Sequence, residues 1–333
     1  MSKMKAPHIR TESSYGKMVF DVMLAIVPLG VFSYVNYGLR PILILLISMV
    51  TAMLCEMLCC MMRRRPLRTV RDSTAAVTGL LIGFIMSPMV DYWVPMVAAA
   101  FAILVAKAPF GGTGRNVFNP AAAGLALVTF CFPEQMFTYP ALSKTPLPLD
   151  FSIAGTVVTA PSLAEQLRSG AAPSLTAMEL LLGDFAGPIG ATAALILVAF
   201  AIYLLVRRTA SLWVMAPYFI TCVVLAWMFP VSVMNPTYNM LTQLCSGYVI
   251  FTGVFLLNDP VTTPRFWLGR LWYGIYTACL VMLLQHIGQA QAGCCFAILM
   301  MNVLSPIIDR WSWHSWHWLI RKLRIRKEVK AYE

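Results

Sequence analysis

Charged side chains are scarce in this sequence of 333 residues. They make up 12% of it, with 25 basic and 14 acidic residues, against about 25% in a typical soluble domain. Hydrophobic residues reach 59%, so too little polar surface remains to cover a water-soluble globule. These proportions exclude a soluble enzyme and a nucleic-acid-binding protein, despite the net charge of +11. They predict an all-α polytopic membrane protein whose surroundings are membrane lipid.

Metal-ligand patterns are lacking as well. The sequence has four histidines, and its nine cysteines include no Cys-x-x-Cys pair. A metal or iron–sulfur site needs about four converging ligands, whereas cysteines such as Cys59, Cys60, Cys294 and Cys295 lie in apolar runs. We therefore interpret the cysteines as small packing residues and expect no metal site.

The apolar residues gather in runs, and a helix needs about 20 such residues to cross a membrane. We predict about ten transmembrane helices, at residues 18–36, 41–62, 73–88, 93–109, 117–132, 186–206, 212–229, 240–257, 271–287 and 293–308. Short runs interrupted by Gly and Pro, such as 73–88, are typical of broken helices that line an internal site.

Basic residues mark one side of the membrane. The segment RRRPLRTVR at 63–71 holds five arginines. Smaller clusters lie at 207–208, at 265–270 and in the tail at 321–330. All of them fall on one side when ten spans are threaded with both termini inside, as the positive-inside rule requires. The sequence therefore predicts a multi-pass protein of the cell (inner) membrane with both termini cytoplasmic.

One connection, residues 133–185, is much longer than the others and carries five acidic and two basic residues. A loop of this length in a compact protein is usually functional. It separates an N-terminal half, residues 1–132, from a C-terminal half, residues 186–310, which a basic cytoplasmic tail at 311–333 follows. Five spans on each side of an external loop predict two inverted five-helix halves, as in many transport folds.

The segment KAPFGGTGRNVFNPAAAG at 107–124 combines glycines, an arginine and two amides. Its glycines permit positive φ and close backbone approach, and Asn116 and Asn119 are spaced to share one face of the following helix. Amides inside a membrane need polar partners. An isoalloxazine ring offers such partners, or alternatively the asparagines cap the helix and bond the glycine loop. Gly112, Arg115, Asn116 and Asn119 are therefore candidate cofactor-binding residues.

A second segment, TGVFLLNDPVTTPRFWLGR at 252–270, places Asp259 at the inner end of a predicted span. A carboxylate at the membrane edge is by default a functional candidate. The same class contains Asp21, Glu56 and Asp72. Two interpretations of Asp259 stay open, a place on an ion path and a helix end tied to Arg265 or Arg270 by an ion pair.

Several motifs together resemble a known family. They are APHIRTESSYGKMVFDVMLAIVP at 6–28, RDSTAAVTGLLIGFIMSP at 71–88, PFGGTGRNVFNPAAAG at 109–124, PSLTAMELLLGDFAGPIG at 173–190, DPVTTPRFWLGRLWYG at 259–274 and MNVLSPIIDR at 301–310. In this order, and nearly end to end, the sequence is similar to the D subunit of Rnf complexes. The resemblance extends to a related protein, the B subunit of the sodium-pumping NADH:quinone reductase.

The resemblance implies a subunit of a redox-driven translocase, with no complete active site in this chain alone. The complex would pass electrons between reduced ferredoxin and NAD and drive sodium ions or protons outward. Its other membrane and peripheral subunits would be the partners of this chain. The family fold is a pair of inverted five-helix repeats, related to urea and ammonium channels.

The resemblance also implies flavins. Family members typically carry FMN, joined through its phosphate to a threonine of the external loop. In the related reductase, paired asparagines of the FNP segment contact riboflavin, and the matching positions here are Asn116 and Asn119.

The sequence departs from the family at the FMN site. The family signature reads approximately Asp-x-x-Ser/Thr-x-Ala-Thr-Pro-Leu, and a gapless match puts Gly155 at the acid and Pro161 at the acceptor threonine. Pro161 has no hydroxyl, and Thr159 is the nearest candidate if the register shifts. Two hypotheses follow, an electron-carrying flavoprotein subunit and a cofactor-free channel-like or transporter subunit.

Overall fold

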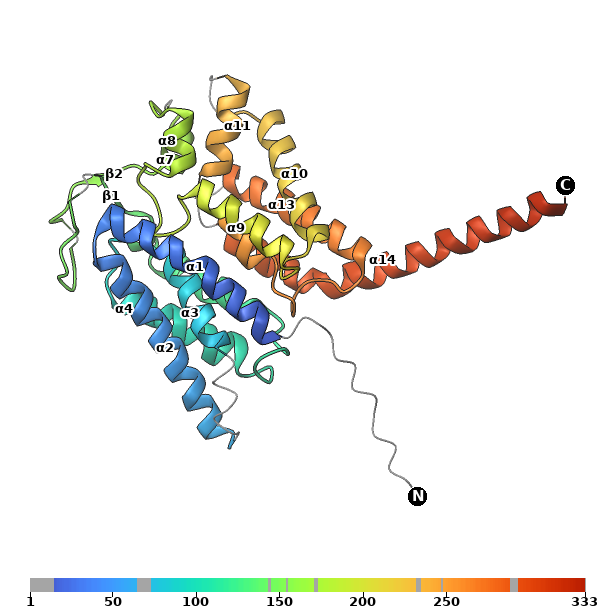
Figure 1. The fold of residues 1–333 in the computed structure, drawn as a ribbon, viewed down its shortest axis with the longest axis horizontal. Coiled ribbons are helices and arrows are strands. Elements are labelled where there is room, and N and C mark those ends of the chain that lie inside the picture. Colours follow the sequence, from blue (N-terminus) through green and yellow to red (C-terminus); the bar gives the residue numbers. More distant parts are fainter. Residues whose placement is uncertain are drawn as a thin grey trace.

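The computed structural model describes residues 15–64, 73–142, 145–153, 155–170, 173–231, 235–246, 248–287 and 293–332. Within these ranges the chain is mostly helical, and its one sheet is a small ribbon of two strands (Figure 1). The predicted all-α class is confirmed. The arginines at 65, 68 and 71, together with Asp72, lie outside the described residues.

The helices of the first half follow the first five predicted runs. They are α1 (Tyr15–Tyr37), α2 (Arg40–Met62), α3 (Thr74–Ile85), α4 (Trp93–Phe101), its π-helical continuation η2 (Ala102–Lys107), and α5 (Pro120–Cys131). Helix α2 packs along α3 and α4, and α5 packs against the same two helices. Helix α5 begins at Pro120 because proline is favoured at the first helical position, where its missing N–H costs nothing.

The long connection contains short elements of its own. They are α6 (Pro133–Phe137), β1 (Tyr139–Pro140), β2 (Thr159–Ala160), α7 (Leu163–Arg168) and α8 (Ala177–Leu182). The two strands are antiparallel, with Tyr139 opposite Ala160 and Pro140 opposite Thr159. Helix α8 begins with a capping box, in which Thr176 and Glu179 satisfy each other's backbone N–H groups.

Arg40, the first residue of α2, ties this connection to the bundle and is completely buried. Its Nε donates to the carbonyl oxygen of Pro88 at 3.0 Å, and Nη2 donates to that of Val90 at 3.0 Å. Nη1 donates to the carbonyl oxygen of Pro148 in the long connection at 3.2 Å. The guanidinium carbon also lies 4.7 Å from the centre of the Tyr92 ring, within cation–π range. Backbone oxygens and one aromatic face thus surround this cation.

The second half has a matching set of helices. They are α9 (Ala194–Val206), α10 (Leu212–Met228), α11 (Pro236–Cys245), α12 (Val249–Phe251), its π-helical continuation η3 (Thr252–Leu256), α13 (Trp267–Ile287) and α14 (Gly293–Tyr332). Helix α14 does not stop at the predicted residue 308. No glycine or proline follows Pro306, so the helix continues through the basic tail and projects from the body (Figure 1).

Glycines allow the helices of each half to touch backbone to backbone. A Cβ on Gly124 of α5 would lie 2.4 Å from the carbonyl oxygen of Ala98 in α4. A Cβ on Gly274 of α13 would lie 2.5 Å from the carbonyl oxygen of Val214 in α10. Small residues at such crossings are typical of membrane helices, which associate by close packing.

Among the described residues, four helices are long and apolar enough to cross a membrane. They are Gly16–Tyr37, Arg40–Met62, Trp267–Ile287 and Gly293–Lys322. The pair formed by α11 and α12–η3, bent by 63°, would make a fifth span. The other apolar helices have 10–17 residues and are α3, α4–η2, α5, α9 and α10. The chain is thus a polytopic, multi-pass membrane protein, and the inverted ten-span arrangement stays a prediction.

The two ends of the helix bundle differ in chemistry. The end that we call the basic end carries Arg63, Arg64, Arg207, Arg208, Arg265 and Arg270. Helix α1 begins there, where Asp21 pairs with Arg207 at 3.1 Å. It finishes at the opposite end, the loop end, where the N–H of Leu147 donates to the carbonyl oxygen of Tyr37 at 3.0 Å. The 23 residues of α1 rise about 34 Å, which is close to the thickness of a bilayer's hydrocarbon core.

Candidate functional site

A cavity of about 130 Å³ lies at the basic end, where segments of both halves meet. Helices α1, α3 and α5, the end of η2 and the residues after η3 line it. Three residues singled out in the sequence, Asn116, Asn119 and Asp259, all face this cavity. The fold therefore brings together two motifs that are more than 100 residues apart in the chain.

Asn119 is a helix cap and a tether. Its Oδ1 accepts hydrogen bonds from the N–H groups of Ala121 and Ala122, at 3.0 and 3.3 Å. Its Nδ2 donates to the carbonyl oxygen of Leu256, the last residue of η3, at 2.9 Å. The expectation that Asn116 and Asn119 share a helix face was wrong, because Pro120 sets the start of α5 and both asparagines precede it. Asn119 joins the two halves at the cavity.

Asn116 contacts the other predicted residue directly. Its Nδ2 donates to Oδ2 of Asp259 at 3.3 Å and to the carbonyl oxygen of Phe118 at 3.1 Å. Asp259 also accepts from the N–H of Val261 at 3.1 Å and from the hydroxyl of Thr262 at 3.3 Å. Burial raises the pKa of the Asp259 carboxyl, and these hydrogen bonds oppose the rise.

The alternative interpretation of Asp259, an ion pair with a following arginine, was wrong. Among the described residues, Asp259 forms no ion pair. Arg270 instead donates to the carbonyl oxygen of Pro264 at 3.0 Å and to the hydroxyl of Ser211 at 3.4 Å. Asp21 does pair with an arginine, at position 207.

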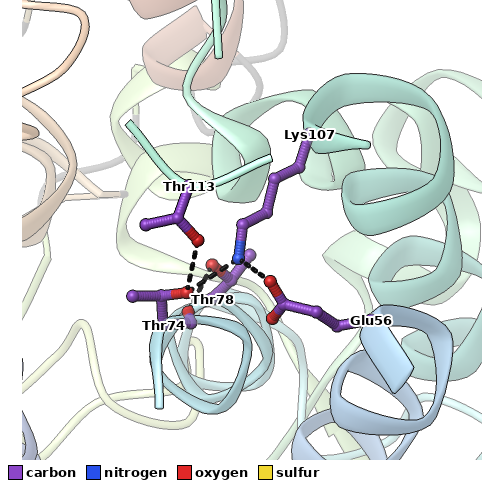
Figure 2. A network of polar contacts seen from close by, with 5 residues as sticks. All are labelled: Glu56, Thr74, Thr78, Lys107 and Thr113. Atoms are coloured by element: carbon purple, nitrogen blue, oxygen red, sulfur yellow. Dashed lines mark hydrogen bonds and ion pairs between the residues drawn. The ribbon is translucent and has the colours of Figure 1, made fainter. Parts of the chain in front are cut away.

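A buried ion pair adjoins the cavity, and sequence reasoning missed it. Lys107 Nζ lies 2.7 Å from Oε1 of Glu56 and 2.7 Å from the hydroxyl of Thr74, which contacts the hydroxyl of Thr113 at 3.3 Å. Figure 2 shows Lys107 reaching into this cluster, where Thr78 donates to the backbone of Thr74. The second carboxylate oxygen of Glu56 is buried without a hydrogen-bond partner. The sequence did hold a sign of this ion pair, because Glu56 and Lys107 are charged residues within two separate apolar runs.

Two π-helical segments deliver residues to this cavity. Segment η2 ends at Lys107, and η3 ends at Leu256, two residues before Asn258. Asn258 and Asp259 both line the cavity. Single π-helical turns widen the helix and occur frequently at functional sites. The two segments therefore support a functional role for the cavity independently of its polar residues.

Two candidate cofactor residues lie beside the cavity and not in its lining. The N–H of Gly112 donates to the carbonyl oxygen of Lys107 at 3.2 Å, and Gly112 has φ of 90°, which suits glycine. Arg115 is exposed, with its side chain folded over Gly111. Their neighbour Thr113 reaches the cavity instead. Their role in binding a cofactor stays a prediction.

Thr159 lies far from this cavity. It is exposed on β2, in the connection packed at the loop end. The nearby hydroxyl of Thr156 is engaged with the carbonyl oxygen of Ile153 at 2.8 Å. Ser162, the first hydroxyl after Pro161, is buried and caps α7 by accepting from the N–H of Glu165 at 3.2 Å. Thr159 is therefore the hydroxyl of this stretch that combines exposure with no capping role.

No group of three or more potential metal-ligating side chains occurs in the part of the chain that the structure describes. The cysteines in this part form no disulfide, and Cys60, Cys222, Cys245, Cys294 and Cys295 are buried.

The sequence can now be compared with known proteins. The profile of the NQR2, RnfD, RnfE family matches residues 2–315, which is nearly the whole chain. The chain belongs to this family. The resemblance stated from its motifs is therefore confirmed. The matched residues include all those that line the cavity.

Three relatives in the family show the same extent of similarity. The D subunit of the proton-translocating ferredoxin:NAD(+) oxidoreductase complex of Clostridium ljungdahlii is 26% identical, covering 92% of this chain and 93% of the relative. The D subunit of the Na(+)-translocating complex of Acetobacterium woodii is 29% identical, covering 98% and 97%. The D subunit of the ion-translocating oxidoreductase complex of Halorhodospira halophila is also 29% identical, covering 93% and 94%. Proteins named for different ions are thus about equally similar to this chain.

Proposed function

We propose that this chain is the flavin-bearing membrane subunit of an ion-translocating ferredoxin:NAD oxidoreductase of the Rnf type. It acts with the other membrane and peripheral subunits of that complex. The observation that carries the proposal is the convergence of Asn116, Asp259 and Lys107 on one cavity between the two halves. The relatives, which are subunits of such redox-driven translocases, support it.

The proposed arrangement has ten membrane-spanning segments in two inverted halves. The bent and short helices α3, α5 and α11–α12 would be broken spans that meet inside the protein, as in many transporters. The basic end would face the cytoplasm, because positively charged residues stay on that side. The loop end would then face outward, with both termini on the cytoplasmic side of the cell membrane.

The lining of the cavity has the chemistry that one edge of a riboflavin ring needs, and its volume of about 130 Å³ would take part of that ring. Apolar side chains of Val22, Leu81 and Phe255 form part of its wall, whereas Asn116 and Lys107 give it a polar rim. A neutral planar ring with acceptors along one edge needs this combination of surfaces. Asn119 would act as a positioning residue, since its amide is already used at both ends. When bound, a flavin supplies electron transfer, for which the protein provides orientation and electrostatics.

Asp259 is the proposed point of contact with the ion path. Its carboxyl lies at the basic end of the spans, where burial favours its neutralisation by a proton or a sodium ion. Lys107 lies near enough to lower the pKa of Asp259 by its positive charge. A change in charge within the cavity would therefore alter the affinity of Asp259 for a cation. In this way reduction of a flavin could be coupled to the movement of an ion.

FMN is proposed to be held at the loop end, with Thr159 as its acceptor. A phosphoester would join the Thr159 hydroxyl oxygen to the FMN phosphate. Pro161 occupies the acceptor position of the gapless family match. The exposure of Thr159 on β2, next to the buried cap Ser162, supports the shifted register.

The test is the absorbance of the purified complex near 450 nm, followed by fluorescence of the denatured chain in a gel. We expect flavin absorbance, and fluorescence that Thr159→Ala removes while the matched Thr156→Ala retains it. Persistence of the signal in Thr159→Ala would reject this acceptor. A colourless chain in the intact complex would instead favour the cofactor-free channel-like subunit.

The cavity is tested separately by Asn116→Ala. We expect loss of non-covalent riboflavin from the complex, measured after extraction, with Thr159-linked FMN unchanged. Asn235→Ala, which removes a helix cap outside the cavity, is the control for general disruption. Full retention of riboflavin in Asn116→Ala would contradict the assignment of this residue.

A further inference from the structure

A second cavity, of about 390 Å³, lies at the basic end and is separate from the first. It is an open groove between the start of α13 and the middle of α14, lined by Arg265, Phe266, Asp309, Arg310, Trp313 and His314. None of these residues borders the cavity that holds Asn116 and Asp259.

The arginines of this groove are unpaired. Arg265 and Arg310 are exposed, and neither guanidinium has a hydrogen-bond or ion-pair partner within the described ranges. Asp309 lines the same groove but forms no ion pair with them, and its Oδ1 accepts from the N–H of Phe266 at 2.8 Å, so two guanidiniums face one carboxylate. Two free guanidiniums in one groove offer a fork of N–H donors that suits phosphate oxygens.

The surroundings place the groove at the depth of lipid headgroups. Seven of the nine tryptophans gather at this end, which indicates an interfacial aromatic belt, and they are Trp213, Trp267, Trp272, Trp311, Trp313, Trp316 and Trp318. Five of these rings contact another tryptophan across α10, α13 and α14, as between Trp213 and Trp267 at 5.2 Å. Farther along α14, Lys322 lies 4.9 Å above the ring of Trp318.

We propose that this groove binds the phosphate headgroup of an anionic phospholipid of the membrane. Arg265 and Arg310 hold the phosphate, and Trp313 packs against the glycerol region. The exposed apolar side chains of Ile307 and Leu304, one and two turns before Arg310 on α14, lie alongside the acyl chains. Charge complementarity favours this occupant, since basic side chains at a membrane surface attract anionic lipid.

The test uses the purified complex carrying the Arg265→Gln/Arg310→Gln double substitution. Binding of phosphatidylglycerol and of phosphatidylcholine is measured by native mass spectrometry during titration with each lipid. We expect the affinity for phosphatidylglycerol to fall at least about fivefold, and the weaker binding of phosphatidylcholine to stay unchanged. The matched control is Arg63→Gln/Arg64→Gln, which removes two exposed charges at the same end outside the groove.

Three outcomes would overturn the proposal. They are unchanged phosphatidylglycerol affinity in the groove variant, an equal loss in the control, and loss of a partner subunit with lipid binding intact. The last outcome would identify the groove as a protein interface. Should the double variant fail to assemble, Arg310→Lys serves instead, and it should weaken phosphatidylglycerol binding less than Arg310→Gln does.

Discussion

Arg40 and Lys107 are both buried cations of the first half, at opposite ends of the bundle. Arg40 lies at the loop end and donates to backbone carbonyl oxygens from two separate segments. Lys107 lies at the basic end and faces a carboxylate, a hydroxyl and a cavity. The chemistry of their partners therefore differs, although both charges are removed from water.

We interpret this difference as one between a buried charge with a structural role and a buried charge that serves the proposed function. Backbone carbonyl oxygens cannot titrate, and the hydrogen bonds that Arg40 donates to them hold the long connection in place. Lys107 has a partner, Glu56, with one oxygen unsatisfied, next to space that a ligand can enter. A buried ion pair with an unsatisfied oxygen destabilises the fold, so its presence beside a cavity suggests that it is kept for function.

The largest effect is expected for Arg40→Leu. The substitution leaves several buried carbonyl oxygens without a donor, each costing roughly 1–3 kcal/mol. Summed over these oxygens, we expect a loss of more than about 5 kcal/mol in the free energy of unfolding, seen as a much lower Tm of the purified protein. Arg40→Lys, which keeps one donor group, should lose less. An unchanged Tm in Arg40→Leu would remove the distinction between the two cations.

The next effect is that of Lys107→Met, which leaves the Glu56 carboxylate buried and unpaired. Breaking one side of a buried pair typically costs about 3–5 kcal/mol, whereas replacing both sides with apolar residues is often nearly neutral. The double variant Glu56→Leu/Lys107→Met should therefore be more stable than Lys107→Met alone, as measured by thermal unfolding. Equal stability of the single and double variants would show that the pair is not coupled.

A smaller effect tests the tether between the halves. Asn119 and Asn235 each cap a helix that begins with proline, but only Asn119 also bonds across to η3. Asn235→Ala should cost about 1 kcal/mol as a lost cap. Asn119→Ala should cost about 1 kcal/mol more in chemical denaturation, because it also leaves the Leu256 carbonyl oxygen without this donor. Equal costs would show that the tether contributes nothing.

The smallest effect is that of Thr159→Ala. The side chain is exposed on β2 and packs on little, so the free energy of unfolding should change by less than about 0.5 kcal/mol. A larger loss of stability would give Thr159 a structural role and weaken its use as a probe of flavin attachment.

The sequence predicted the helices well because hydrophobic runs and prolines act locally. Pro120 and Pro236 begin helices within or near the predicted runs, and each follows an asparagine cap. Asn116, Asn119 and Asp259 were also found, since polar groups stand out in apolar surroundings. The contacts among these three residues could not be predicted, because they depend on how helices distant in the sequence pack together.

Other features had no local signal. The pattern of apolar residues in the π-helical segments η2 and η3 is that of an ordinary helix, so the sequence does not reveal their wider turns. The pairing of Lys107 with Glu56 joins residues 51 apart in the chain on different helices. The continuation of α14 past residue 308 could have been read from the absence of glycine and proline there.

The length of α1 sets a condition on how charge could travel through this protein. Its two ends, near the cavity and near the long connection, stand apart by almost the whole insulating layer of the bilayer. Two flavins, one at the cavity and one at the long connection, would be separated by a layer of aliphatic side chains. Electrons would then not pass directly from one flavin to the other within this chain. A redox group of a neighbouring subunit would have to carry them between the two sites.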